Sequence, residues 1–255
     1  MSTIRPIRVE SVDDIRIVTM TRPDQMNAIN AELHSSLTGV WAELAEDRDA
    51  RAVVLTGEGR AFSAGGDLDW LTEVATNPDV RWRAIDEGGR LVREMLRCPL
   101  PVVAAVNGPA VGLGASIASL CDLVVMSERA FFADPHVQIG VAAGDGVVAT
   151  WPGVIGMQLA KEYILLGGRI PATRALELGL ANRVVDPDAL LPTAIDLARQ
   201  LGALPKYALR ATKRAMNMIV EATGMRGLDY ALASESEHFS LDEVRASLVA
   251  MRAYD

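Results

Sequence analysis

The sequence has little of what several classes of protein require. It contains only two cysteines, Cys98 and Cys121, and each adjoins an apolar segment. Buried free thiols are therefore expected rather than a disulfide. Basic side chains are also scarce: 25 Lys and Arg stand against 33 Asp and Glu, for a net charge of −8. This balance argues against a general nucleic-acid binder, which needs a basic surface.

Segments that would take the chain to a membrane are absent as well. Residues 1–14 have no apolar stretch of the kind that a secretory signal needs. Residues 98–121 carry no charged side chain, but several prolines and glycines interrupt them. A buried strand, turn and helix explains this stretch better than a membrane span does. We therefore expect a cytoplasmic protein with no membrane partner and no nucleic-acid partner.

What the sequence does have is a large apolar fraction and two kinds of periodicity. Half of its 255 residues are hydrophobic, enough for one large domain or a domain with a small appendage. Residues up to about 145 alternate strands with helices, whereas later residues are mainly helical, so the fold class is α/β with a helical tail. Strands are expected at 15–20, 52–56, 102–106, 122–126 and 130–133. A helix is expected at 31–46 with Asn30 as its cap, and another begins after Asp67. A longer amphipathic helix has Trp82 and Leu96 on its apolar face. Further helices are expected at 115–120, 157–166, 172–178, 188–201, 205–222, 225–238 and 241–253.

Two glycine-bearing turns, about fifty residues apart, are the most informative feature of the sequence. The first contains Gly65 and Gly66 after a β-branched run, and the second contains Gly112 and Gly114 after another such run. Each turn opens onto a helix, where backbone N–H groups have no helical partner and carry the positive end of the helix dipole. Two such groups that converge on a carbonyl oxygen form an oxyanion hole. The pattern therefore predicts an enzyme that acts beside a carbonyl group.

These motifs resemble those of the crotonase superfamily, also called the enoyl-CoA hydratase/isomerase family, over nearly the whole chain. The most specific segments are 62–68 and 101–108, with support from Cys121-Asp122 and from 165–170 and 175–185. The resemblance implies a spiral core of ββα units followed by a helical region that forms trimers, often as a dimer of trimers. We assign residues 1–200 to the core with the acyl-CoA site, and 201–255 to a helical oligomerisation region.

The resemblance also implies a substrate and the residues that bind it. The substrate is a coenzyme A thioester, and no metal or separate cofactor is expected. The backbone N–H groups of Gly66 and Leu113 are the expected carbonyl-binding donors. The adenine and pantetheine end of coenzyme A is expected near a set of residues close to the first turn: Arg22, Met26, Ala64, Asp67 and Leu68.

The chain departs from the family's pattern where the hydratases carry their two glutamates. Ser116 stands at the first position and His136 at the second. The pKa of a serine hydroxyl is far above 7, so the group stays protonated and cannot serve as a general base without help. The small size of Ser116 favours a packing role at a helix start. His136 is followed by Asp145 between two glycines, and a carboxylate beside a histidine can fix its tautomer and stabilise the imidazolium. We expect His136 and Asp145 to replace the glutamates and to relay a proton to or from water or the α-carbon.

Two alternatives remain open beside this hydratase/isomerase-like enzyme. The histidine with a later Gly-Asp-Gly is similar to the carbon–carbon bond hydrolases of the superfamily, which cleave β-diketones by a retro-Claisen reaction. Those enzymes also use a glutamate in the C-terminal helices, for which Glu235 and Glu237 are the candidates here. Loss of both hydratase glutamates leaves a second alternative, a catalytically silent CoA-ester binder. Among other polar residues, Asp134 is expected as a turn or rim residue, and His34 and His238 as surface or packing residues on helices.

Overall fold

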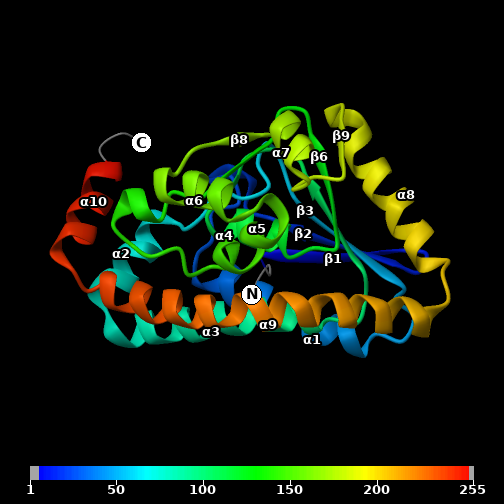
Figure 1. Cartoon of the computed structure of the whole chain (residues 1–255), viewed down its shortest axis with the longest axis horizontal. Helices are drawn as coiled ribbons and strands as arrows, with labels where there is room; N and C mark the ends of the chain where they lie inside the picture. The colour runs from blue at the N-terminus through cyan, green and yellow to red at the C-terminus, as the bar shows by residue number, and fades with distance from the viewer. Residues whose placement is uncertain (1–5, 253–255) are drawn as a thin grey trace, which may run out of the picture.

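The computed structural model describes residues 6–252, which form a central six-stranded sheet with helices on both faces (Figure 1). The strand order is β1-β2-β3-β4-β6-β9, in which only the β1–β2 pair is antiparallel. The strands are β1 Ile7–Val12, β2 Ile15–Met20, β3 Ala52–Gly57, β4 Val102–Val106, β6 Leu123–Ser127 and β9 Arg183–Val185. The order places the C-terminal ends of the parallel strands β3 and β4 side by side, so the two turns that follow them begin at the same end of the sheet.

The sheet separates two apolar layers because successive side chains of a strand point to opposite faces. On one face, Val54 and Val103 pack against helix α8 (Leu190–Gly202). On the other face, Leu55 and Ala104 belong to the main core, which α1 (Ala31–Glu46) and α3 (Pro78–Arg97) also line. Figure 1 shows α8 on one side of the sheet and α1, α3 and α9 on the other.

The remaining elements surround the turns. A second sheet has the order β5-β7-β8. Its strands are β5 Ala110–Val111, β7 Phe131–Ala133 and β8 Ile170–Pro171, and the helices nearby are α2 Leu68–Thr76, α4 Leu113–Ser119, α5 Val147–Ile155, α6 Met157–Leu166, α7 Ala172–Leu178 and α10 Asp242–Arg252. Short 3-10 turns occur at η1 Pro23–Gln25, η2 Val137–Ile139 and η3 Pro187–Ala189. Asn30 and Asp67 cap α1 and α2 as the sequence predicts, because each side chain accepts a hydrogen bond from a first-turn N–H.

The largest departure from the predicted elements is α9. The sequence predicts two helices, 205–222 and 225–238, but the structure has one helix of 33 residues, Lys206–His238. The glycine that suggests a break, Gly224, is instead a contact point between helices. A Cβ there would lie 2.7 Å from the backbone oxygen of Ala149 on α5, so only glycine permits this close approach. Further along α9, Leu228 and Leu232 enter the main core.

Three further findings bear on the predictions. Cys98 and Cys121 are buried free thiols, as expected. Trp82 was assigned to the apolar face of α3, but its side chain is 71% exposed, so that assignment is wrong. Within residues 6–252, no helix combines the length and apolar character needed to cross a membrane.

Candidate functional site

The two glycine-bearing turns lie against each other at the end of the sheet. A parallel bridge joins Ser63 to Ala110: the N–H of Ser63 donates to Pro109 O at 3.0 Å, and the N–H of Val111 donates to Ser63 O at 2.9 Å. The close packing needs glycine, since a Cβ on Gly65 would lie 3.2 Å from Val111 O. Segments that are far apart in the sequence therefore form one structural unit.

The amides of Gly66 and Leu113 both remain without an acceptor in this unit. In the bridge between Gly66 and Ile29, Ile29 bonds to the neighbours of Gly66: it donates to Gly65 O at 2.7 Å and accepts from Asp67 N at 2.9 Å. The N–H of Gly66 therefore points to the opposite side. Leu113 is the first residue of α4, where an N–H has no helical acceptor. Among the hydrogen bonds of residues 6–252, none is donated by either amide.

Both residues line a cavity of about 840 Å³ that includes an open mouth. Its walls are mainly apolar, with side chains from α2, α3, α9 and α10, and a few polar groups lie among them. The polar side chains are His34, His136, Asp145 and Glu235. A largely apolar cavity with a small number of convergent polar groups is typical of a small-molecule site.

His136 is clamped between two carboxylates. Its Nδ1 lies 2.8 Å from Asp134 Oδ1, and its Nε2 lies 3.0 Å from Asp145 Oδ2. Gly112 allows the imidazole to approach the second turn: its φ of 54° is a left-handed conformation that favours glycine, and a Cβ there would lie 3.4 Å from His136 Cε1. The imidazole is thus fixed beside the turn that carries Leu113.

The two carboxylates decide the charge of His136. Burial by itself lowers the pKa of the imidazolium, but the negative charges of Asp134 and Asp145 and their hydrogen bonds raise the pKa well above its ordinary value. With a carboxylate at each ring nitrogen, both nitrogens act as donors. Asp134 is fully buried, whereas the Asp145 side chain is 16% exposed. The cluster therefore holds an imidazolium, with Asp145 on its cavity side.

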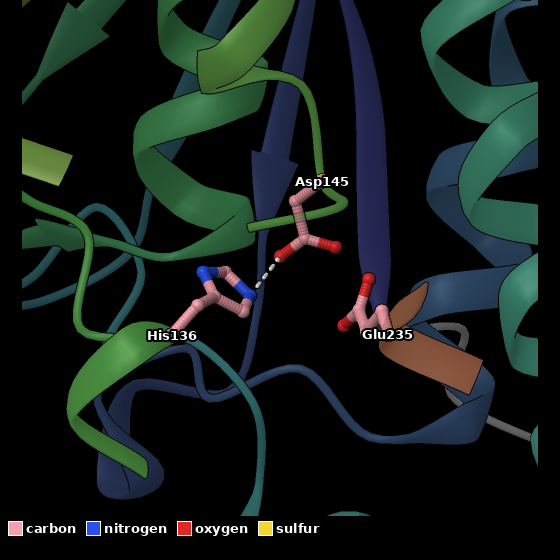
Figure 2. Close-up of side chains that lie close together, drawn as sticks. All are labelled: His136, Asp145 and Glu235. Atoms are coloured by element: carbon pink, nitrogen blue, oxygen red, sulfur yellow. Dashed lines mark ion pairs between the residues drawn. The ribbon is translucent and has the colours of Figure 1, made fainter. Parts of the chain in front are cut away.

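Glu235 of α9 completes the cluster. Figure 2 shows its carboxylate directed toward Asp145 and His136, which come from the opposite side of the site. Its Oε2 is buried and has no hydrogen-bond partner among the described residues. Glu235 Oε2 lies so close to Gly144 that a Cβ added to Gly144 would be only 2.0 Å from this oxygen. Burial and the charge of Asp145 raise the pKa of Glu235 well above its ordinary value, which favours the neutral acid.

This cluster offers two kinds of chemistry at one place. Asp145 is a carboxylate that can accept a proton, and Glu235 is a carboxylic acid that can donate one. One nitrogen of His136 and one carboxyl oxygen each of Asp145 and Glu235 all lie within 4.8 Å of one another. One cation could also reach all three, but His136 Nε2 already bonds to Asp145 at 3.0 Å. With His136 charged and Glu235 neutral, the charge on His136 offsets one of the two aspartate carboxylates.

The residues predicted for coenzyme A form a second group next to the first turn. Arg22 Nη2 lies 3.0 Å from Asp67 Oδ2, and the N–H of Ala64 donates to Met26 O at 3.0 Å. Leu68 begins α2 immediately after Asp67. Of the five, Ala64 also lines the cavity. The structure thus brings the predicted residues together, and their role with coenzyme A stays a prediction.

Sequence reasoning missed part of this site. Asp134 is not a rim residue but a fully buried partner of His136, and their spacing of two residues after β7 was the available signal. His34 lines the cavity on the buried stripe of α1 that also carries Leu37 and Trp41, which a helical projection would have found. Glu235 continues the buried stripe of α9 that carries Leu228 and Leu232, and this helical spacing was the signal that separates it from the exposed Glu237.

Two other predicted residues lie outside the cavity. Ser116 is fully buried beside Gly146, as a packing residue would be, and its Oγ has no partner among the described residues. His238 accepts a hydrogen bond at Nδ1 from the N–H of Ala142, at 3.2 Å. It thereby ties the loop before Asp145 to α9.

Comparison with known proteins shows the family of the chain. The family model described as Enoyl-CoA hydratase/isomerase matches residues 10–254. A short-chain-enoyl-CoA hydratase from Clostridium acetobutylicum is 34% identical over 232 residues, covering 91% of this chain and 87% of that protein. A 1,2-epoxyphenylacetyl-CoA isomerase from Escherichia coli is 34% identical over 205 residues, covering 80% and 78%.

A solved structure agrees with this placement. The crystal structure of an enoyl-CoA hydratase/isomerase from Mycobacterium paratuberculosis matches this chain with a TM-score of 0.94 and 46% sequence identity. The match covers 98% of this chain and 100% of that protein. The likeness includes the mixed α/β core and the C-terminal helices. The chain therefore belongs to the enoyl-CoA hydratase/isomerase family of enzymes.

Proposed function

We propose that this enzyme acts on an acyl-CoA thioester, and that the N–H groups of Gly66 and Leu113 hold the thioester oxygen as it becomes negatively charged. The observation that carries the proposal is the joint position of these groups. Two amides without acceptors and a carboxylate–acid pair border the same cavity. Related proteins named as acting on CoA thioesters support the substrate class.

Hydration of an enoyl thioester uses every part of this arrangement. Asp145 takes a proton from water while the water oxygen bonds to the β-carbon, and the electrons of the double bond form an enolate. The two amides stabilise its oxygen. Glu235 then gives its proton to the α-carbon, and the proton on Asp145 passes to Glu235, whose ligand atom lies within 4.8 Å. His136, already protonated on both nitrogens, accepts no further proton; it holds Asp145 in place and stabilises its negative charge.

Isomerisation of a double bond needs the same groups without the water. One of the two carboxyl groups, Asp145 or Glu235, removes a proton from the acyl chain of the substrate. The other returns a proton to a different carbon, while the amides of Gly66 and Leu113 hold the dienolate oxygen. The coenzyme itself is expected along the segment with Arg22 and Asp67, whose mutual ion pair keeps them in place next to the first turn.

A proline at position 113 tests the carbonyl-binding role directly. Leu113 is the first residue of α4, where proline is tolerated, so Leu113→Pro removes the N–H while the helix can still form. We expect turnover of crotonyl-CoA, followed by loss of the enoyl absorbance, to fall about 10²–10³-fold. Leu113→Ala keeps the N–H and serves as the control. Equal activity in the two variants would rule out this donor.

A second candidate is hydrolysis of a carbon–carbon bond in a β-dicarbonyl compound. The buried, protonated form of Glu235 favours it, because the resembling hydrolases use a glutamate from the C-terminal helices. Water that gives its proton to Asp145, which His136 holds in place, would add to one carbonyl, and the bond to the central carbon would break as Glu235 protonates that carbon. Crotonyl-CoA and a panel of β-diketones, assayed side by side, distinguish the two reactions. Binding of CoA esters without turnover of either class would indicate a silent binder.

We also propose that residues 201–255 form the oligomerisation region of a homotrimer or a dimer of trimers, as the family resemblance implies. Large apolar side chains of α9 on the outside of the subunit support this proposal. They are Tyr207, Met216, Met218, Ile219 and Tyr230. An exposed apolar surface of this kind is typical of a contact with another subunit.

A further inference from the structure

The cavity contains a second histidine–carboxylate pair that the proposed chemistry does not use. His34 of α1 lines the cavity, and its Nδ1 lies 3.0 Å from Glu87 Oε2 on α3. The His34 side chain is 4% exposed and that of Glu87 is 16% exposed. The pair joins two helices below an otherwise apolar part of the cavity wall.

The orientation of the ring leaves Nε2 for a ligand. An ionised carboxylate only accepts hydrogen bonds, so Nδ1 carries the hydrogen that Glu87 accepts. No hydrogen bond of Nε2 occurs among the described residues, and a Cβ on Gly88 would lie 3.9 Å from this atom. Gly88 itself lines the cavity. The ring of Trp70 lies 5.0 Å from the imidazole, centroid to centroid, and covers another side.

Packing alone does not explain a pair of this kind. Burying a histidine and a carboxylate requires removal of water from both, and apolar side chains of the same size commonly stabilise a core at least as well. Neighbouring lining residues are indeed apolar, such as Ile85 and Leu232. A single polar atom in an apolar wall fixes the orientation of a ligand that can bond to it.

The position of the pair indicates which part of a substrate it meets. A Cβ on Gly88 would also lie 3.8 Å from Leu232, so His34 adjoins the cavity next to that residue. Leu232 precedes Glu235 by three residues of α9, a helix rise of about 4.5 Å. His34 therefore adjoins the cavity wall about one helical turn of α9 away from Glu235, a spacing of a few bonds of an acyl chain.

We propose that His34 and Glu87 form a recognition site for a hydroxyl group on the acyl chain of the substrate, beyond the carbons that react. A hydroxyl both donates and accepts, so it pairs with Nε2 whether the imidazole is neutral or charged. The natural substrate class is then a hydroxyl-bearing acyl thioester rather than a plain hydrocarbon chain. This inference rests on the proposed action on acyl-CoA thioesters.

Binding of unreactive thioesters tests the site separately from the chemistry. Hexanoyl-CoA is compared by calorimetry with 5-hydroxyhexanoyl-CoA and 6-hydroxyhexanoyl-CoA, which have no double bond to hydrate. We expect the wild type to bind at least one hydroxylated chain about tenfold more tightly than the plain chain. His34→Asn keeps an amide next to Glu87 and removes the cavity-facing nitrogen, so the preference should disappear while binding of hexanoyl-CoA is retained.

Two further variants keep the test decisive if His34→Asn fails to fold. Gly88→Ala places a methyl group in front of Nε2 at an ordinary contact distance, in a helix where alanine is favoured, and should also abolish the preference. Glu87→Gln should weaken it, whereas Asp86→Asn removes the same charge from an exposed position on α3 and should not.

The outcomes separate this inference from the function on which it rests. Equal binding of the three thioesters by the wild type, or a preference that survives both His34→Asn and Gly88→Ala, would overturn the hydroxyl site alone. If the wild type binds none of the thioesters, the proposed function fails and the hydroxyl site fails with it. A preference lost in those variants, with plain-chain binding intact, establishes the site.

Discussion

Held between two carboxylates, the side chain of His136 can be tested by simple truncation. His136→Ala removes the partner that orients Asp145, so turnover should fall by about 10²–10⁴-fold while the Michaelis constant changes little. Steady-state kinetics with crotonyl-CoA or an active β-diketone measures both. Val137→Ala, at the neighbouring 42% exposed position, is the control and should keep full turnover. An unchanged turnover number in His136→Ala would refute the assignment.

The raised pKa of Glu235 predicts a particular dependence of stability on pH. The stability that its neutral form provides is fully present below the ordinary glutamate pKa and is lost as the pH rises through the higher pKa of the folded state. Glu235→Gln removes this titration. As the pH rises from the ordinary glutamate pKa to the higher pKa of the folded state, the wild type loses stability that the variant keeps. The difference in free energy of unfolding should grow in favour of Glu235→Gln by up to about 1.4 kcal/mol per pH unit.

Chemical denaturation at a series of pH values measures this gain. A constant difference between Glu235→Gln and the wild type would contradict the raised pKa. The same variant should lose turnover at every pH, since an amide does not supply the proton that Glu235 gives. Stability and activity thus change in opposite directions, which separates a proton donor from a residue that only packs.

At the scale of residues, the sequence predicts what lies near in the chain and misses what tertiary packing selects. His136 and Asp145 belong to one loop region and lie together as expected. Asp134 was misjudged because its spacing of two residues from His136 was not used, and a turn residue was assumed instead. Glu235 was not chosen over Glu237, although it shares one face of α9 with Leu228 and Leu232; its contact with the loop at Gly144 depends on tertiary packing.

Among the elements, the contact between α5 and α9 is sensitive to a small change. A methyl group at Gly224 meets the backbone of Ala149, so Gly224→Ala should reduce the free energy of unfolding by about 1–3 kcal/mol. Gly227→Ala lies on the same helix with nothing within 4 Å, and it should raise the stability by about 0.5–1 kcal/mol. Thermal or urea unfolding compares the two. Equal effects would mean that the close approach is not needed.

Which elements the sequence predicts follows from how they are buried. The strands at 15–20, 52–56 and 102–106 are mainly apolar and are buried at every residue, and the structure confirms them almost to the residue. β1 was missed because most of its side chains are exposed. α5 was missed because Pro152 lies inside it, and α9 was divided because a contact glycine reads like a helix end.

For the whole molecule, the exposed apolar side chains of α9 predict a defined assembly. Light scattering should give three or six times the 27.3 kDa mass of the chain. Ile219→Asp places a charge where the side chain is 65% exposed in the isolated subunit, and should shift the mass toward a single chain. Val9→Asp, on the outer strand β1, is the control. A wild type that stays at the mass of one chain would contradict the proposed trimer.

Fold class and family are the parts of the whole that the sequence predicts best, and both are confirmed. The paired glycine turns and their flanking strands carry this information locally, so they can be recognised before any packing is known. The shape of the cavity depends instead on α2, α3, α9 and α10 together. For that reason the pair formed by His34 and Glu87 emerged only from the structure.

The place of Glu235 in the penultimate helix has a consequence for biosynthesis. A ribosome makes the two glycine-bearing turns and the His136 loop before it reaches Glu235. A polypeptide released anywhere between Asp145 and Glu235 would contain both turns and the imidazole, yet it would lack the carboxyl group that α9 adds to the cavity.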